Sequence, residues 1–354
     1  MLISKLGRST QLLADNFNKK YNAYRIDVSS QTNNQINDLL DNISIKKDTV
    51  VVSCQDVWRS YDHEQAIFNH PALQGKRVII STAGYYNKKY TNLHYHISIP
   101  ESYYLRSSRK EEFIPLSNNL GYGFSCLNNR TSTDRFILGY SLYKNKLLDN
   151  MIFTQNYIES DFENLEYSES PDGIVKRDMS AFDIKKFYEY KNLLPMRLDM
   201  HKDLGEINFK FFDNKEGWEI PFEHPAFANA YCFISVEGAI EEYPYSENIN
   251  LPFCTEKSFK AFITRQIPLT VGARGHYAYL KSLGFEMLED FLPAGYDNMP
   301  FLHKVDAIVS TVAKGKNYVK DYYFKNLEKI KHNYQLVHSQ KVEQLIMQRI
   351  ADIL

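Results

Sequence analysis

The chain has 354 residues, of which 44% are hydrophobic and 24% are charged, and its formal net charge at pH 7 is −1. This length predicts two domains, each with its own core, and the ordinary composition excludes a disordered or fibrous chain. The sequence has no run of eighteen apolar residues and no signal-peptide pattern at its N-terminus. It therefore predicts a cytoplasmic protein, in the host cytoplasm if the chain is viral, with no membrane partner.

The first part of the chain alternates between strand and helix patterns. The run 48–54 is continuous and β-branched, which is typical of a buried parallel strand. We expect residues 1–118 to form a Rossmann-like domain with strands at 1–6, 24–28, 48–54, 77–81 and 94–99, and helices at 11–20, 34–43 and 63–69. Residues 1–125 carry a net charge of +4 and the remainder −5, so an anionic acceptor is compatible with this part of the chain but not required.

A polar, irregular stretch at 106–119 predicts the linker to a second Rossmann-like domain at 119–316. Its expected strands are 123–127, 151–154, 233–236 and 268–271, and its expected helices are 136–148, 181–194, 258–264 and 276–283. Residues 155–220 hold a turn-rich stretch and a hairpin pattern at 205–217, but no recognisable chemistry. The tail at 317–354 is expected to be helical throughout, with apolar residues at three- and four-residue spacing.

The cysteines and one histidine pair suggest no metal site. The four cysteines lack Cys-x-x-Cys spacing, which indicates reduced core residues rather than a disulfide frame or a zinc site. His94 and His96 alternate on one strand, so they are either a metal pair or, in the interpretation we favour, a half-buried strand face. We therefore expect no metal.

The most informative stretch is 231–297. A short strand pattern ends at Glu237, and Thr255 is a good N-cap for a helix whose first turn carries Glu256 and Lys257. In parallel sheets ligands bind beyond the carboxyl ends of the strands, where helix N-termini offer free N–H groups. A carboxylate there can hold a ribose diol, and an ammonium can meet a diphosphate.

Two further features of this stretch fit the same ligand. The strand 268–271 closes at Gly272, and Arg265 and Arg274 add positive charge that we expect to lie nearby. The alternative interpretation is an ordinary capped helix with a surface ion pair.

A second stretch has the same character. The strand 123–127 is followed by Asn128, Arg130 and Arg135, and Arg135 falls at the start of the next helix. A guanidinium at that place can clasp a phosphate that the helix dipole also attracts. The alternative is a solvated turn in which Arg135 pairs with Asp134.

The stretch 255–297 resembles the donor-binding segment of GT-B glycosyltransferases. The resemblance lies in the order of three features, namely a Thr-Glu-Lys helix start, a strand that ends in glycine and a following stretch that ends in Tyr-Asp. The chain is similar to α1,3-fucosyltransferases and to phage and bacterial relatives over about residues 121–300. The resemblance implies that Glu256 holds the ribose, that Lys257, Asn128, Arg130 and Arg135 contact the phosphates, and that Asp297 positions the sugar or braces the loop.

The resemblance also implies an architecture. Two Rossmann-like domains would face a cleft, and the C-terminal helix at 317–354 would cross back onto the N-terminal domain, although a dimerising helix stays an alternative. Glu237 is followed by Gly-Ala-Ile-Glu-Glu rather than by the Asn-Ser pair typical of fucosyltransferases, so a UDP-sugar is favoured over a GDP-sugar. The chain has no Asp-x-Asp, which agrees with metal-independent transfer; no cofactor other than the nucleotide-sugar co-substrate is expected.

An inverting transferase needs a general base near the acceptor hydroxyl, whereas a retaining one does not. Asp56, just past the strand 48–54, is the first choice, and Asp62, His63 and Glu101 are weaker ones. The alternative for Asp56 is a helix or turn cap.

The acceptor stays open between two classes. One is double-stranded DNA with a hydroxymethylated cytosine, by analogy with the DNA glucosyl- and arabinosyltransferases of T-even-like phages, and the other is a cell-surface polysaccharide. The rival from another class is a non-catalytic nucleotide-binding protein. Whether the chain is a monomer or a dimer is likewise open.

Overall fold

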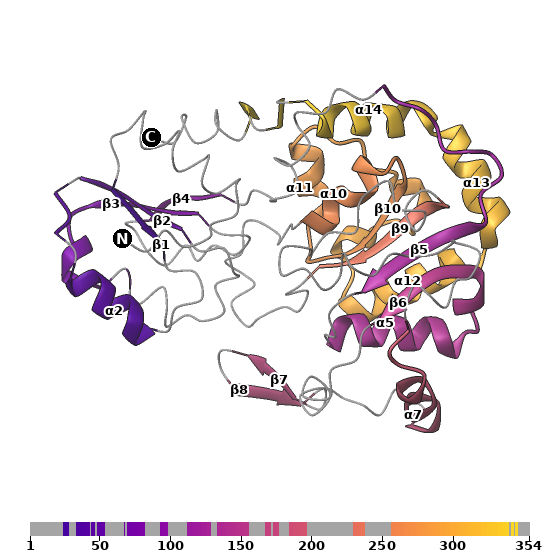
Figure 1. The fold of residues 1–354 in the computed structure, drawn as a ribbon, viewed down its shortest axis with the longest axis horizontal. Coiled ribbons are helices and arrows are strands. Elements are labelled where there is room, and N and C mark those ends of the chain that lie inside the picture. The colour runs from indigo at the N-terminus through magenta and orange to yellow at the C-terminus, as the bar shows by residue number, and fades with distance from the viewer. Residues whose placement is uncertain are drawn as a thin grey trace, which may run out of the picture.

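The structure is a computed structural model. It describes residues 24–27, 33–42, 44–46, 48–53, 67, 69–81, 93–97, 112–128, 133–155, 167–170, 173–176, 184–196, 229–237, 256–339, 341–342 and 344–345. Within these residues the fold is α/β and contains two four-stranded parallel sheets and one hairpin. In Figure 1 the two sheets are well separated, with β1–β4 on the left and β5, β6, β9 and β10 on the right.

The first sheet has the strand order β1-β2-β3-β4, and every neighbouring pair is parallel. Its strands are Tyr24–Asp27, Thr49–Ser53, Arg77–Ser81 and Leu93–Ile97, and the helix α2 spans Asn33–Asp41. Valines and isoleucines of β1–β3 pack with α2 into a core of their own. The strands expected at 24–28, 48–54, 77–81 and 94–99 and the helix expected at 34–43 are confirmed. The strand expected at 1–6, the helix at 11–20 and most of the helix at 63–69 lie outside the described residues.

The second sheet has the order β10-β9-β5-β6 and is also parallel throughout. Its strands are β5 (Tyr122–Asn128), β6 (Met151–Gln155), β9 (Ala230–Val236) and β10 (Ile267–Val271). Every residue of β6, β9 and β10 is buried, as expected where helices cover both faces of a parallel sheet. All four strands were predicted, because such strands are continuous apolar runs.

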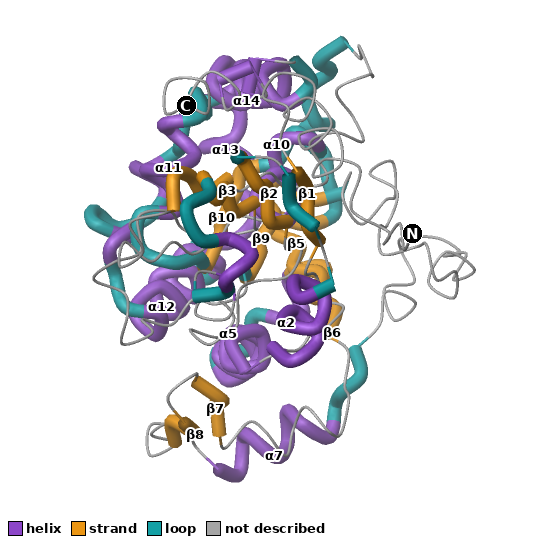
Figure 2. The backbone as a smooth tube through the Cα atoms, turned by 90° about the vertical axis from the view of Figure 1, so that its left-hand side faces the viewer, coloured by secondary structure: helices purple, strands orange, loops and turns teal. Residues whose placement is uncertain are grey.

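Helices cover both faces of this sheet. Gly139 of α5 lies against Phe153 of β6, and Gly123 of β5 lies against Lys316 of α13. Phe153 pairs in register with Cys126, and residues at odd and even places of a strand project to opposite faces, so α5 and α13 lie on opposite faces. Figures 1 and 2 agree, with α5 below the strands and α10 and α14 above them, while α12 packs on α5. These helices are Thr133–Lys144 (α5), Glu256–Ile263 (α10), Phe301–Val312 (α12), Gly315–Lys325 (α13) and Leu327–Val337 (α14).

The tail differs from the expected single helix. It breaks at Asn326, whose backbone N–H donates to the carbonyls of Tyr322 and Tyr323 and whose side-chain Nδ2 donates to the Tyr322 carbonyl at 3.0 Å. An asparagine amide competes with the helix in this way, and the prediction of a continuous helix is therefore wrong here. α14 packs on α10 and Val342 joins the core of the second sheet, while a crossing onto the first sheet lies outside the described residues.

The remaining elements give smaller corrections. The helix expected at 136–148 ends at Lys144, because Lys146 takes a left-handed conformation (φ 56°), and a 3-10 turn follows at Leu148–Asn150. The turn-rich stretch contains the hairpin β7 (Tyr167–Ser170) and β8 (Gly173–Lys176), and α7 spans Ile184–Asn192. The hairpin expected at 205–217 lies outside the described residues. Within the described part of the chain no helix is both long and apolar enough to cross a membrane.

The stretch expected to be the linker is bound to the second sheet's domain where the structure describes it, from residue 112 on. The Leu116 N–H donates to the Tyr323 hydroxyl at 3.1 Å, and the Tyr231 hydroxyl donates to the Ser117 carbonyl at 3.0 Å. Leu116 is also part of that domain's core. This segment therefore belongs structurally with the C-terminal sheet.

Candidate functional site

The strand order defines a switch point between β5 and β9. From β5 the chain runs through α5 to β6 on one side, and from β9 it runs through α10 to β10 on the other. Both crossovers are right-handed by the general rule, so the two helices must cover opposite faces. Cys126 of β5 pairs with Ile234 of β9, so the carboxyl ends of both strands are level. The N-termini of α5 and α10 therefore flank the same edge, which is where doubly wound sheets bind ligands.

On the α5 side the site contains Asn128 and Arg135. Asn128 is the last residue of β5, is buried, and donates from Nδ2 to the Cys126 sulfur at 3.4 Å. Burial raises the pKa of the Cys126 thiol to about 12, and the Asn128 bond and the Arg135 charge oppose that rise. Arg135 lies in the first turn of α5 and is half-buried.

On the α10 side, the first turn of the helix starts at Glu256 and includes the half-buried Lys257. Ser258 follows, and its hydroxyl bonds to the Glu237 carboxylate and lies 3.2 Å from His276 Nε2. Glu237 is only 1% exposed, and its N–H donates to the Val271 carbonyl at 3.0 Å. Glu237, which ends the strand expected at 233–236 and was a candidate donor-binding residue together with Thr255 and Gly272, is therefore engaged inside the protein.

Gly272 follows β10 and has a packing role. A Cβ built on it would lie 2.8 Å from Cγ and Nδ1 of the His276 ring, closer than real Cβ atoms come to other atoms. The glycine is thus the residue that lets the imidazole lie against the end of β10. From there the ring reaches Ser258.

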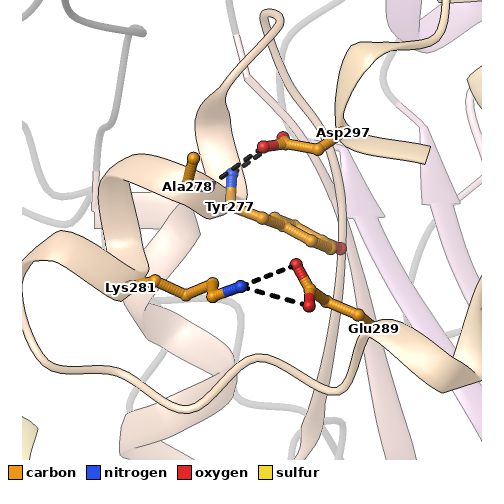
Figure 3. Close-up of polar contacts among 5 residues, drawn as sticks. All are labelled: Tyr277, Ala278, Lys281, Glu289 and Asp297. Atoms are coloured by element: carbon orange, nitrogen blue, oxygen red, sulfur yellow. Dashed lines mark hydrogen bonds and ion pairs between the residues drawn. The ribbon is translucent and has the colours of Figure 1, made fainter. Parts of the chain in front are cut away.

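Asp297 caps the helix that follows β10, α11 (His276–Ser282), as Figure 3 shows. Its two carboxylate oxygens accept from the N–H groups of Tyr277 at 2.8 Å and Ala278 at 3.0 Å. The N–H of Gly275 donates to the Asp297 carbonyl at 3.3 Å. Of the two roles that the resemblance implies for Asp297, this geometry is that of the loop brace.

Lys304 of α12 fixes the same loop from the other side. It is 1% exposed, and its ammonium donates to the carbonyls of Gly272 (2.9 Å), Ala273 (3.2 Å) and Asp297 (2.9 Å). Burial lowers its pKa to about 8, an effect that Arg274 adds to and the Asp297 charge opposes. The exposed Arg274 therefore sits on a loop clasped at both ends.

The structure contradicts the position expected for Arg265. It was expected near the ligand, but it follows α10 and precedes β10, which places it at the amino edge of the sheet. There its Nη1 donates to the Ile114 carbonyl at 2.8 Å, and its backbone is left-handed (φ 63°). Arg265 is close to Lys257 in sequence but not in space, because α10 carries the chain from the carboxyl edge of the sheet to its amino edge.

Several predicted residues lie outside the described part of the chain, namely Asp56, Asp62, His63, Glu101, Arg130, Thr255 and the side chains of Glu256, His94 and His96. Among the residues that are described, no group of three or more His, Cys, Asp or Glu side chains is arranged to hold a metal ion.

Two buried polar residues were missed. Ser258 had a signal, since it is a polar residue on the buried side of α10 beside Phe259 and Phe262. Lys304 also had one, because it falls on the apolar stripe of α12 at three- and four-residue spacing from Phe301 and Ile308. A cation on such a stripe requires buried partners.

Comparisons of the chain with protein-family models, with curated proteins and with solved structures find no match.

Proposed function

We propose that the chain is a metal-independent glycosyltransferase of the GT-B type. It binds a nucleotide diphosphate-sugar at the carboxyl edge between β5 and β9 and transfers the sugar to an acceptor hydroxyl. The observation that carries the proposal is the strand order β10-β9-β5-β6, which brings the N-termini of α5 and α10 to one edge. Two helix N-termini with a cation in each first turn make a favourable environment for a diphosphate.

In this proposal each cation has a role. Arg135 and Lys257 contact the diphosphate from opposite faces of the sheet, and they stabilise the charge that develops on the leaving nucleotide. Arg274 reaches the same group from the clasped loop. Glu256, in the first turn of α10, accepts from the ribose diol; the other acid at this edge, Glu237, is engaged with Ser258.

The first sheet is the proposed acceptor side. It is parallel, so its own carboxyl edge offers a second place for polar groups. Asp56 follows the end of β2 at Ser53 by three residues and is the proposed general base. Asp56→Asn should lower kcat about 100-fold or more while the KM for the donor stays unchanged. An unchanged kcat would remove Asp56 from the mechanism, as a retaining reaction also would.

A thermal-shift panel of UDP-, GDP-, CMP- and dTDP-sugars tests the proposal. One of them, with UDP-sugars first, should raise the melting temperature by several degrees at about 100 times its Kd, which corresponds to about 2.7 kcal/mol. Arg135→Ala and Lys257→Ala should each weaken that ligand about tenfold or more.

The matched control is Lys281→Ala. Lys281 is an exposed lysine in the last turn of α11, paired with Glu289 at 3.1 Å and directed away from the carboxyl edge. It should leave donor affinity unchanged. If no nucleotide-sugar stabilises the protein, or if all three variants behave alike, the proposal fails. Binding without hydrolysis or transfer would instead indicate the non-catalytic rival.

A further inference from the structure

Three buried polar side chains meet where β9, α10 and α11 come together. Glu237, Ser258 and His276 are each 1% exposed. The Ser258 hydroxyl donates to a Glu237 carboxylate oxygen, and it lies 3.2 Å from Nε2 of His276. The three residues come from the end of a strand, the third residue of one helix and the first residue of another.

The chemistry of the hydroxyl fixes the direction of this chain of hydrogen bonds. Serine has a single O–H proton, and a carboxylate can only accept, so that proton goes to Glu237. The serine oxygen must then accept from His276, which places a proton on Nε2. A buried carboxylate is costly without such donors, so the arrangement holds the three elements in one geometry.

Ser258 is the next residue after Lys257 in the first turn of α10. We propose that Ser258 is a positioning residue, which fixes the first turn of α10 against the ends of β9 and β10 so that Lys257 is set for the diphosphate. This inference rests on the proposed function for its ligand. Its structural part, the fixing of the first turn, does not need a ligand.

The central variant is Ser258→Ala, and Ser235→Ala is its matched control. Ser235 is also a buried serine of this domain, and its hydroxyl bonds to Thr270 Oγ1 at 3.0 Å on the neighbouring strand β10 rather than to a described side chain of α10. Both variants lose one buried hydroxyl, so a general loss of stability should appear in both. Glu237→Gln keeps an oxygen that can accept from Ser258, whereas Glu237→Ala does not.

The first measurement is amide hydrogen exchange without ligand. Ser258→Ala and Glu237→Ala should speed exchange in the first turn of α10 about tenfold, while Glu237→Gln and Ser235→Ala should not. In all four variants the first turn of α5 should stay as in the wild type. Unchanged exchange in α10, or equal changes in both helices, would overturn the inference whether or not a nucleotide binds.

The second measurement compares UDP with uridine. Ser258→Ala should weaken UDP about tenfold more than uridine, because both ligands carry the ribose that Glu256 of the same turn holds, but only UDP carries the diphosphate that Lys257 is set to meet. Equal weakening of both ligands, or no weakening, would overturn the role in diphosphate binding. If the wild type binds neither UDP nor uridine, while the variants show the expected differences in hydrogen exchange, the result counts against the proposed function and not against the fixing of the first turn by Ser258.

Discussion

Replacing Gly139 by alanine tests the packing that places α5, and with it Arg135, on the sheet. On an exposed helix this change stabilises by about 1 kcal/mol, because glycine is a poor helix former. Here the new Cβ would collide with the Tyr190 hydroxyl, would lie 2.5 Å from Gln155 Oε1 and would lie 2.9 Å from Phe153 Cζ. The structure therefore reverses the sign expected from helix propensity.

The size of the effect follows from two contributions. Overpacking a filled core costs about 1–3 kcal/mol, and losing the 2.8 Å hydrogen bond from Tyr190 to Gln155 costs about 1 kcal/mol more. After the gain in helix propensity, Gly139→Ala should destabilise the domain by about 1–3 kcal/mol. That corresponds to a fall in melting temperature of about 2–12 °C for a domain of this size.

Calorimetry on four proteins provides the assay: the wild type, Gly139→Ala, Tyr190→Phe and the double variant. Tyr190→Phe removes the oxygen that the new Cβ would meet. The loss of unfolding free energy in the double variant should therefore be smaller, by about 1 kcal/mol or more, than the sum of the losses in the two single variants. A Gly139→Ala protein that melts at or above the wild-type temperature would refute the reasoning. Additive single effects would show that Tyr190 is not the obstacle.

Two more predictions concern the loop after β10. Because the pKa of Lys304 is about 8 when folded against an ordinary 10.5, the unfolded chain binds more protons between these values and stability should rise with pH there. The free energy of unfolding, measured with urea, should rise by about 2–3 kcal/mol more in the wild type than in Lys304→Met across that pH interval. Equal pH dependence of the two proteins would contradict the burial of the charge. Asp297→Ala should lower the melting temperature by about 2–6 °C, because it removes the acceptor of two α11 amides. Glu289→Ala breaks only an exposed ion pair with Lys281, so it should change the melting temperature by less than about 2 °C. Equal effects of these two changes would contradict the assignment of Asp297 as the cap (Figure 3).

The sheets were predictable from sequence for a physical reason. A strand buried on both faces is a continuous apolar run, so β5, β6, β9 and β10 stood out, and their parallel arrangement followed from the helices between them. Helix N-termini then had to lie at the carboxyl edge. This is why the sequence predicts the starts of α5 and α10 at one edge, although Arg135 and Lys257 are 122 residues apart; a site shared by these two residues stays a prediction.

Helix ends and buried polar contacts were less predictable. The apolar period runs on through Asn326, so only the local hydrogen bonds of its side chain reveal the break between α13 and α14. The partners of Ser258 and Lys304 lie on other elements, 7 to 32 residues away in the sequence. Their sequence signal is a polar residue on an apolar stripe, which says that a partner is needed but not which one. The same limit explains the misplacement of Arg265.

The most direct test of the proposed site is the footprint of UDP on the wild-type protein by amide hydrogen exchange. A diphosphate held between the two helices should slow exchange in the first turns of α5 and α10 together, at 133–136 and 256–259, and leave the first turn of α13 at 315–318, beside the amino end of β5, unchanged. Protection of only one of the two helix starts, or of neither, would contradict a shared site at the carboxyl ends of β5 and β9.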